Sequence, residues 1–298
     1  MAVVAVVVFM LLRLAPGDPI AILAGDNATP DQVEAIRHSL GLEDSLPVQF
    51  LRWISAVLHG DLGTSIFTGA PVLSLIGERL EPTLSLAAIT FLWTVPLAVA
   101  AGVVAAAKAG SLHDRSLMLV SVLGFSVPGF VLGYFLSYAF ALQLRWLPVQ
   151  GYTPLSAGLG PWFQHLILPA ITLGFAYLAL IGRITRTAVL EVLAEDYIRT
   201  AKAKGVAPRP LLVRHALKNA GVPIVTVIGI GIALLIGGVV ITETVFNLPG
   251  VGRLVVDAIQ KRDYPVIQGV TLVFSVVYVL INLLIDLSYS LIDPRVSH

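Results

Sequence analysis

Long runs of apolar residues, separated by charged segments, constrain the fold of this chain more than any other feature. Four runs are long enough to cross the roughly 30 Å apolar core of a bilayer as helices. They cover residues 83–107, 117–144, 220–242 and 266–290, and a fifth run at 164–183 is marginal in length. Only 12% of the 298 residues are charged, about half the proportion usual in soluble domains. We therefore expect an all-α membrane protein rather than a large soluble core.

The first apolar run, residues 2–12, is shorter than the others. At about 1.5 Å per residue it reaches only part of the way across a bilayer. It has the length of the apolar region of a signal peptide, or it belongs to a first span whose start is missing. No Lys or Arg precedes it and Arg13 follows it, which favours a span over residues 1–14. The sequence then predicts six transmembrane helices in one domain, residues 1–298.

Charge is distributed unevenly between the loops. Basic side chains gather in and beside the segment between the fourth and fifth spans, residues 184–219: Arg183, Arg186, Arg199, Lys202, Lys204, Arg209, Arg214 and Lys218. The long segment after the first span, residues 15–82, is instead rich in Asp and Glu. Basic loops stay in the cytoplasm, so we expect both termini there and the acidic loop outside. This topology is that of a multi-pass membrane protein. The net charge of +1 gives no indication of nucleic-acid binding.

The acidic outer loop is predicted to be folded. Thr29-Pro30-Asp31-Gln32 has the pattern of a capping box, and Gly41 is placed to end that helix. A second helix is expected to start near Pro47 and to stop at Gly60. It would place three apolar side chains on one face: Leu51, Ile54 and Leu58. The loop is either a lid packed on the membrane domain or part of a landing site for an external partner, and the two roles are compatible.

Small residues recur at four-residue spacing within the predicted spans. Examples are Gly129 with Gly133, and Ala98 with Gly102 and Ala106. Such stripes let helices approach closely, so packing is their favoured role. Three prolines are expected to kink the helices that contain them: Pro96, Pro128 and Pro169.

The fifth and sixth spans contain the residues that are candidates for a solute pathway or gate. Glycines are densest in the fifth span, where Gly231, Gly237 and Gly238 either pack against neighbours or line the pathway. Asp286 in the sixth span is the exception among spans almost free of ionisable side chains. A structural ion pair with Arg183 or Arg186, or a snorkelling position, is favoured for Asp286 over a role in coupling. So few buried charges indicate that the energy for any transport comes from elsewhere.

Motifs for several kinds of catalytic and binding site are absent from the sequence. It contains no G-x-x-x-x-G-K-[ST] phosphate loop, no H-E-x-x-H, no G-x-S-x-G and no cysteine. The six histidines are scattered without ligand spacing. We therefore predict that this chain has no catalytic, cofactor or metal site of its own.

The basic loop carries the most informative motif. Tyr197-Ile-Arg-Thr-Ala-Lys-Ala-Lys-Gly205, followed by Arg214-His-Ala-Leu-Lys-Asn-Ala220, resembles the cytoplasmic coupling segment, or EAA loop, of ATP-binding-cassette (ABC) importer permeases. The resemblance is to the dipeptide/oligopeptide/nickel family of these permeases. Arg199 and Thr200 stand where the general pattern has Glu and the first Ala, and Lys218 stands where it has Pro. Ala201 and Gly205 match the general pattern.

The resemblance extends over nearly the whole chain. The matching segments are Pro16-Gly-Asp-Pro19, Gly60-Asp-Leu-Gly-Thr-Ser65, Leu147-Pro-Val-Gln-Gly-Tyr152, His165-Leu-Ile-Leu-Pro-Ala170, Glu243-Thr-Val-Phe-Asn-Leu-Pro-Gly-Val-Gly252, Arg262-Asp-Tyr-Pro265 and Asp293-Pro-Arg295. Each is weak alone, but their order and spacing together are specific. The first of them and the long outer loop resemble the first of the two permeases in such systems.

The resemblance implies a type I ABC importer permease fold of six spans, located in a bacterial-type cytoplasmic (inner) membrane. It implies a second homologous permease, two ATPase subunits that bind ATP and Mg²⁺, and an extracytoplasmic substrate-binding protein. This chain would be the non-catalytic permease subunit, without a cofactor, and would move peptides or a related solute such as chelated nickel inward. The solute itself is not defined by the sequence.

The coupling segment is expected to be a short surface helix. Residues 191–204 are rich in helix formers, Gly205 is suited to end the helix, and Pro208 and Pro210 interrupt the chain. The residues implied to contact the ATPases are Tyr197, Arg199, Thr200, Ala201, Lys202, Ala203, Lys204, Gly205, Leu211 and Leu212. The alternative is a basic loop whose only role is to set the orientation of the chain in the membrane. Two other classes remain open: a stand-alone channel or secondary carrier, and a membrane-embedded enzyme.

Overall fold

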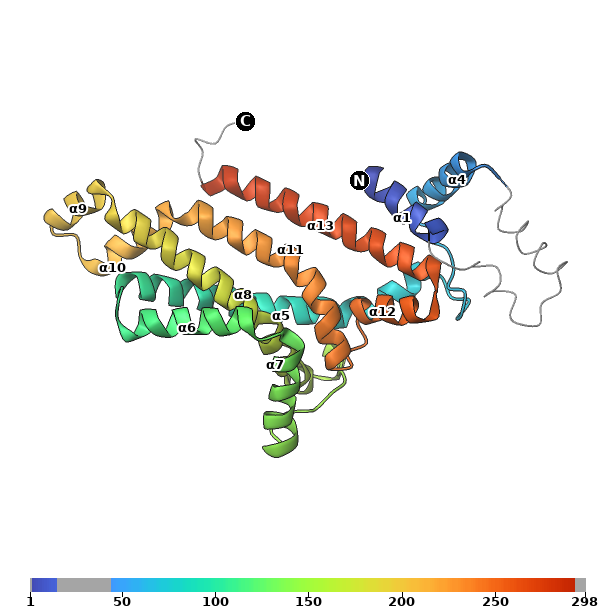
Figure 1. The fold of residues 1–298 in the computed structure, drawn as a ribbon, viewed down its shortest axis with the longest axis horizontal. Helices are drawn as coiled ribbons and strands as arrows, with labels where there is room; N and C mark the ends of the chain where they lie inside the picture. The colour runs from blue at the N-terminus through green and yellow to red at the C-terminus, as the bar shows by residue number, and fades with distance from the viewer. Residues whose placement is uncertain (1, 15–43, 293–298) are drawn as a thin grey trace. The chain divides into compact units, whose positions relative to one another are not determined.

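The computed structural model describes residues 2–14 and 44–292, and this part of the chain is helical apart from its connecting loops and one isolated β-bridge between Thr64 and Pro71 (Figure 1). The longer helices are α1 (Ala2–Leu14), α4 (Leu46–Leu58), α5 (Val72–Ala107), α6 (Leu112–Ser126), α7 (Gly129–Leu136), α8 (Leu159–Ala194), α9 (Asp196–Ala203), α11 (Gly221–Val245), α12 (Val251–Lys261) and α13 (Tyr264–Ile292). Shorter segments are the π-helical η1 (Ser137–Gln143) and η3 (Leu211–Leu217), the 3₁₀ turn η2 (Leu155–Ala157), and α10 (Pro208–Pro210).

The chain divides into two compact units. One consists of Met1–Leu80 and Arg253–Val277, and the other of Glu81–Gly252 and Tyr278–His298. We call the first the terminal unit and the second the central unit.

Small residues bring α5 and α8 together in the central unit, as the stripe at four-residue spacing predicts. Ala98 is fully buried and Ala106 is nearly so. A Cβ atom added at Gly102 would lie 2.6 Å from the carbonyl oxygen of Gly182 and 2.7 Å from Cβ of Thr185, both on α8. The two helix backbones therefore approach too closely at Gly102 for any larger residue.

The predicted span at residues 117–144 is broken in the middle. α6 ends at Ser126, and after Pro128 the chain resumes as α7 and η1, bent by 104° from α6 (Figure 1). Proline is expected to kink this segment, and a break this sharp follows because Val127 takes an extended conformation before Pro128. Gly133 on α7 then packs against α8 and α11, with its Cβ position 3.2 Å from Thr172 and Val245.

The run at residues 164–183, marginal by sequence, lies within the 36-residue helix α8. The helix continues through Pro169 and extends beyond the apolar run at both ends. Beyond residue 183 the extension includes good helix formers such as Ala188, Leu190 and Glu191. α5 is likewise 36 residues long and begins at Val72, so residues 72–82, assigned by sequence to the outer loop, are helical. α11 and α13 correspond closely to the other two predicted spans.

Within residues 2–14 and 44–292, four helices are long and apolar enough to span a membrane, namely α5, α8, α11 and α13, and α6 with the bent α7–η1 segment is a possible fifth span. α1 is an apolar helix of 13 residues, so the prediction of a helix at the start of the chain is confirmed. Its role as a sixth span stays a prediction.

The terminal unit packs α1 against α4 and α13. The ring of Phe9 lies 5.2 Å from that of Phe50 and 5.6 Å from that of Trp53, both on α4. Gln268 on α13 donates a hydrogen bond of 3.0 Å to the carbonyl oxygen of Val8. In the loop before α5, Ser65 donates a buried hydrogen bond of 2.5 Å to Asp263.

The predicted second helix of the outer loop is present as α4, with Pro47 in its first turn. Leu51 and Leu58 on its predicted apolar face are exposed. The aromatic side chains of Phe50 and Trp53 make the packing face instead, because they pack against Phe9. The predicted capping box at residues 29–32 lies outside the described residues.

Candidate functional site: the coupling surface

A sharp turn separates α8 from α9. Glu195 is extended, with φ −67° and ψ 148°, and α9 starts at Asp196, whose carboxylate lies in the first turn of the helix, where it is favourable. α9 ends at Ala203, and Gly205 follows with φ +79°. This left-handed conformation is the one expected of Gly205. The predicted helix over residues 191–204 is therefore two helices, since Glu191 to Ala194 belong to α8.

Two side chains fix α9 to the rest of the central unit. Ile198 is fully buried, so the inner face of α9 is anchored by an apolar contact. Asn219, directly after η3, donates hydrogen bonds of 2.8 Å to the Tyr197 hydroxyl and 2.9 Å to the carbonyl oxygen of His215. α9 contacts both α8 and η3. α9 is thus held between the elements that precede and follow it in the chain.

The outer face of α9 and the turn after it carry basic and small side chains. The predicted coupling residues exposed there are Tyr197, Arg199, Thr200, Lys202, Ala203, Lys204 and Gly205, while Ala201 is half-buried. Arg199 forms an ion pair of 3.3 Å with Asp196, and both side chains are exposed, so the pair contributes little to stability. We call this face, residues 197–205, the coupling surface.

The remaining two predicted coupling residues are less exposed than those of this surface. Leu211 in η3 is buried and Leu212 is half-buried. Leu211 therefore serves as an internal anchor of the returning chain. Pro210 does not interrupt the chain, because Pro208 begins a helical turn and Pro210 continues it directly into η3.

Behind the coupling surface, an ion pair joins α6 to α8. Arg186 donates two hydrogen bonds to Asp114, from Nε to Oδ1 and from Nη2 to Oδ2, the latter 2.8 Å long. The Gly110 N–H donates a further bond of 2.8 Å to the same carboxylate. From the sequence, Arg186 is instead a possible partner of Asp286. Arg183, the other expected partner of Asp286, lies over the ring of Phe125, 5.0 Å from its centroid.

The candidate pathway residues differ in their surroundings. A Cβ at Gly238 would lie 2.7 Å from Leu173, and one at Gly231 would lie 3.7 Å from Tyr177, so both glycines face α8. Gly237 has open space around it, and Asp286 is exposed on α13. Close packing therefore accounts for the glycine at position 238. An added Cβ at Gly231 would make only ordinary van der Waals contact, so Gly231, Gly237 and Asp286 stay candidates.

A buried carboxylate at the far end of α11 is a further feature that the sequence did not predict. Glu243 is fully buried and accepts a hydrogen bond of 2.6 Å from the Thr83 hydroxyl on α5. Thr83 in turn accepts a bond of 2.8 Å from the Val251 N–H at the start of α12. A Cβ at Gly250 would clash with the Glu243 carboxylate. A glutamate followed by a Pro-Gly-x-Gly turn is the signal that identifies such a site.

The loop before α8 is tied to the start of the central unit. The Tyr152 hydroxyl donates a hydrogen bond of 2.9 Å to Oε1 of Glu81, and the Leu155 N–H donates one of 2.7 Å to the same oxygen. Partial burial raises the pKa of the Tyr152 hydroxyl, which therefore stays protonated as a donor. Among residues 2–14 and 44–292, no group of three His, Asp or Glu side chains is placed to hold a metal ion.

Comparisons with known proteins agree with this architecture. Residues 98–298 match the family model of the binding-protein-dependent transport system inner membrane component, and residues 1–87 match the N-terminal model of such membrane components. The chain therefore belongs to the family of inner membrane components of binding-protein-dependent transport systems. It is a multi-pass membrane subunit that is not itself catalytic, and the resemblance to ABC importer permeases is confirmed.

Individual relatives cover the whole chain. The "Probable peptide ABC transporter permease protein y4tP" of Sinorhizobium fredii is 59% identical over 100% of this chain and 95% of its own length. The "Glutathione transport system permease protein GsiC" of Shigella flexneri is 42% identical over 99% of this chain and 94% of its own length. A chain of the MetNI methionine ABC transporter in an inward-facing conformation has a TM-score of 0.61 at 16% identity, covering 74% of this chain and 96% of its own. This likeness confirms the type I importer permease fold.

Proposed function

We propose that this chain is one of two permease subunits of an ABC importer that carries peptides inward across the cytoplasmic membrane. Two partner ATPases bind and hydrolyse ATP, and an extracytoplasmic binding protein delivers the solute. The relatives named for peptide and glutathione transport support short peptides as the solute class, since glutathione is itself a tripeptide.

The coupling surface is the observation that carries the proposal. It presents small and basic side chains outward on a helix anchored by Ile198, and it follows α8 after a single extended residue. Small residues such as Ala203 allow close insertion into a groove of a partner. Closure of the ATPases on ATP binding would push α9 as a rigid body and tilt α8 and α11 between two states.

Two substitutions at the coupling surface test this role. Ala203→Asp adds a charge where the surface is expected to enter a partner, and Gly205→Val forces a β-branched residue into the left-handed conformation. We expect each to lower ATP-driven peptide uptake at least tenfold, or about 1.4 kcal/mol, with normal membrane insertion. Gly205→Asn, which tolerates this conformation, should keep most of the uptake.

Copurification provides the matched control. The ATPases should be lost from Ala203→Asp but kept by Ala157→Asp, an equally exposed alanine in η2 at the other end of α8. Normal ATPase binding and uptake in both Ala203→Asp and Gly205→Val would remove the coupling role. Peptide flux into liposomes by the chain alone, without ATP, would favour a channel or secondary carrier instead.

The proposed topology has both termini and α9 in the cytoplasm. Because the chain has no cysteine, single cysteines can be labelled without background. A membrane-impermeant maleimide should label Ala157→Cys in intact cells and Ala203→Cys only after permeabilisation. The reverse pattern would invert the orientation.

A further inference from the structure

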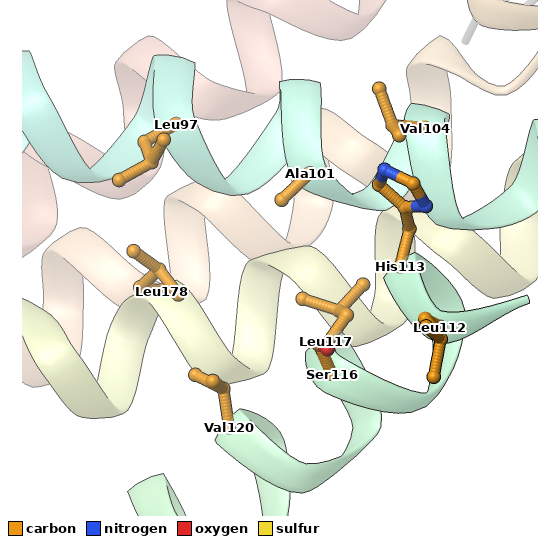
Figure 2. A pocket seen from close by; sticks show the side chains of 9 residues that line it. All are labelled: Leu97, Ala101, Val104, Leu112, His113, Ser116, Leu117, Val120 and Leu178. Carbon is orange, nitrogen blue, oxygen red and sulfur yellow. The ribbon is translucent and has the colours of Figure 1, made fainter.

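An apolar groove runs between α5 and α6 with α8 as its floor, at the end where α5 turns into α6. It has a volume of about 480 Å³, within the range of sites that take small molecules. Figure 2 shows Leu97, Ala101 and Val104 of α5 on one wall, Leu117 of α6 on the other, and Leu178 of α8 below. The small side chain of Ala101 leaves the middle of the groove open.

The groove continues along the same helices into a second cavity of about 820 Å³, which shares Val120 and Leu178 with it. The second cavity is almost wholly apolar, and its Trp93 indole N–H already donates to the Ala170 carbonyl oxygen at 3.3 Å. From Val104 to Ile89 the helix rises about 22 Å, more than the roughly 15 Å depth of one leaflet. The two cavities together therefore accommodate an extended acyl chain.

The polar residues that line the groove, His113 and Ser116, lie near the start of α6, the end that we call the mouth of the groove. His113 lies there beside Val104 (Figure 2). Lys108 lies one helical turn after Val104, and its backbone N–H donates a hydrogen bond of 3.1 Å to the Val104 carbonyl oxygen. Lys108 therefore continues the face of α5 on which Val104 lies. The nearest acid, Asp114, is buried and neutralised by Arg186, so it does not oppose an anion at the mouth.

We propose that this groove is a binding site for an anionic phospholipid, with an acyl chain in the two cavities and the phosphate at Lys108 and His113. Basic pockets between transmembrane helices on the cytoplasmic side are suited to anionic lipid headgroups. An apolar trough with a cationic rim at one end matches the two parts of such a lipid. This site does not depend on the transported solute or on the ATPases.

The test uses the purified chain, with any subunits that accompany it, in nanodiscs of equal parts phosphatidylglycerol and phosphatidylcholine. Native mass spectrometry then counts the lipids retained on the protein. Lys108→Gln with His113→Gln should lower the preference for phosphatidylglycerol about fivefold. Lys108→Arg should keep it. Arg115→Gln removes an exposed charge from the same end of α6 outside the groove and should change it little.

Filling the groove tests the apolar part separately. Ala101→Phe should displace the retained lipid whatever its headgroup, whereas Ala88→Phe, on an exposed position of α5 outside both cavities, should not. Equal lipid retention in these two variants would overturn the proposal. So would an equal loss of phosphatidylglycerol in Arg115→Gln, or crosslinking of Ala101→Cys to another subunit, which would make the groove a protein interface.

Discussion

Arg186 on α8 donates two hydrogen bonds to Asp114 on α6, and the side chain of Asp114 is only 6% exposed. The pair joins two helices that are far apart in the sequence, at the end of the central unit that carries the coupling surface. A buried ion pair is costly to form, but breaking it by removing one partner costs more, because an uncompensated charge is left behind.

Asp114→Asn is therefore expected to destabilise the chain by roughly 3 kcal/mol. The free energy of unfolding, measured by denaturant titration in detergent micelles, checks this. Asp286→Asn, which removes an exposed carboxylate on α13, is the control and should change stability by less than about 0.5 kcal/mol. The double variant Asp114→Leu with Arg186→Leu should lose less free energy of unfolding than Asp114→Asn does. A larger loss in the double variant would contradict this account.

Gly102 marks the closest approach of α5 and α8. Gly102→Ala would place its Cβ 2.6 Å from the Gly182 carbonyl oxygen, so the helices must separate, at a cost of about 1–3 kcal/mol. The same substitution at Gly237, where nothing lies within 4 Å, should be neutral or slightly stabilising because alanine favours helix. Detergent unfolding curves compare the two, and equal stabilities would refute tight packing at Gly102.

Ile198 anchors α9 from within. Ile198→Ala removes a fully buried side chain and is expected to weaken the seating of α9 by about 2–4 kcal/mol. Proteolysis between α8 and α9 should become faster, while the rest of the chain keeps its resistance. Val213→Ala, at an exposed position in η3, is the control. If Ile198→Ala is cleaved no faster than Val213→Ala, the anchor is elsewhere.

Thr83 links the buried Glu243 carboxylate to the start of α12. Thr83→Val removes the hydroxyl that donates to Glu243 and accepts from Val251, at an expected cost of about 2 kcal/mol. Thr244→Val is matched to it, since the Thr244 hydroxyl bonds only to the carbonyl oxygen of Val240 on its own helix. Thermal unfolding should separate the two variants, and equal melting temperatures would count against a structural role for Thr83.

The helices and their close contacts were largely predictable from the sequence. Runs of apolar residues define α5, α11 and α13, and small residues at four-residue spacing locate the contact at Gly102. Gly205 takes the left-handed conformation expected of it. These features depend on local chemistry, which one sequence contains in full.

What depends on distant partners was not predictable. Glu195 is a good helix former, yet the chain turns there, and Ile198 becomes buried against neighbouring helices. Arg186 had several acids as possible partners, and only the packing of α6 on α8 selects Asp114. Which face of α4 packs against α1 likewise depends on the aromatic contact between Phe50 and Phe9.

The length of α8 has a mechanical consequence. At 36 residues the helix is about 54 Å long, with the loop hydrogen-bonded to Glu81 at one end and α9 at the other. Such a rod acts as a lever: a tilt of about 5° about one end carries the other through about 5 Å, roughly one helical turn. Moving as a rigid body, α8 would convert a small angular change at one end into a side-chain-sized displacement at the other.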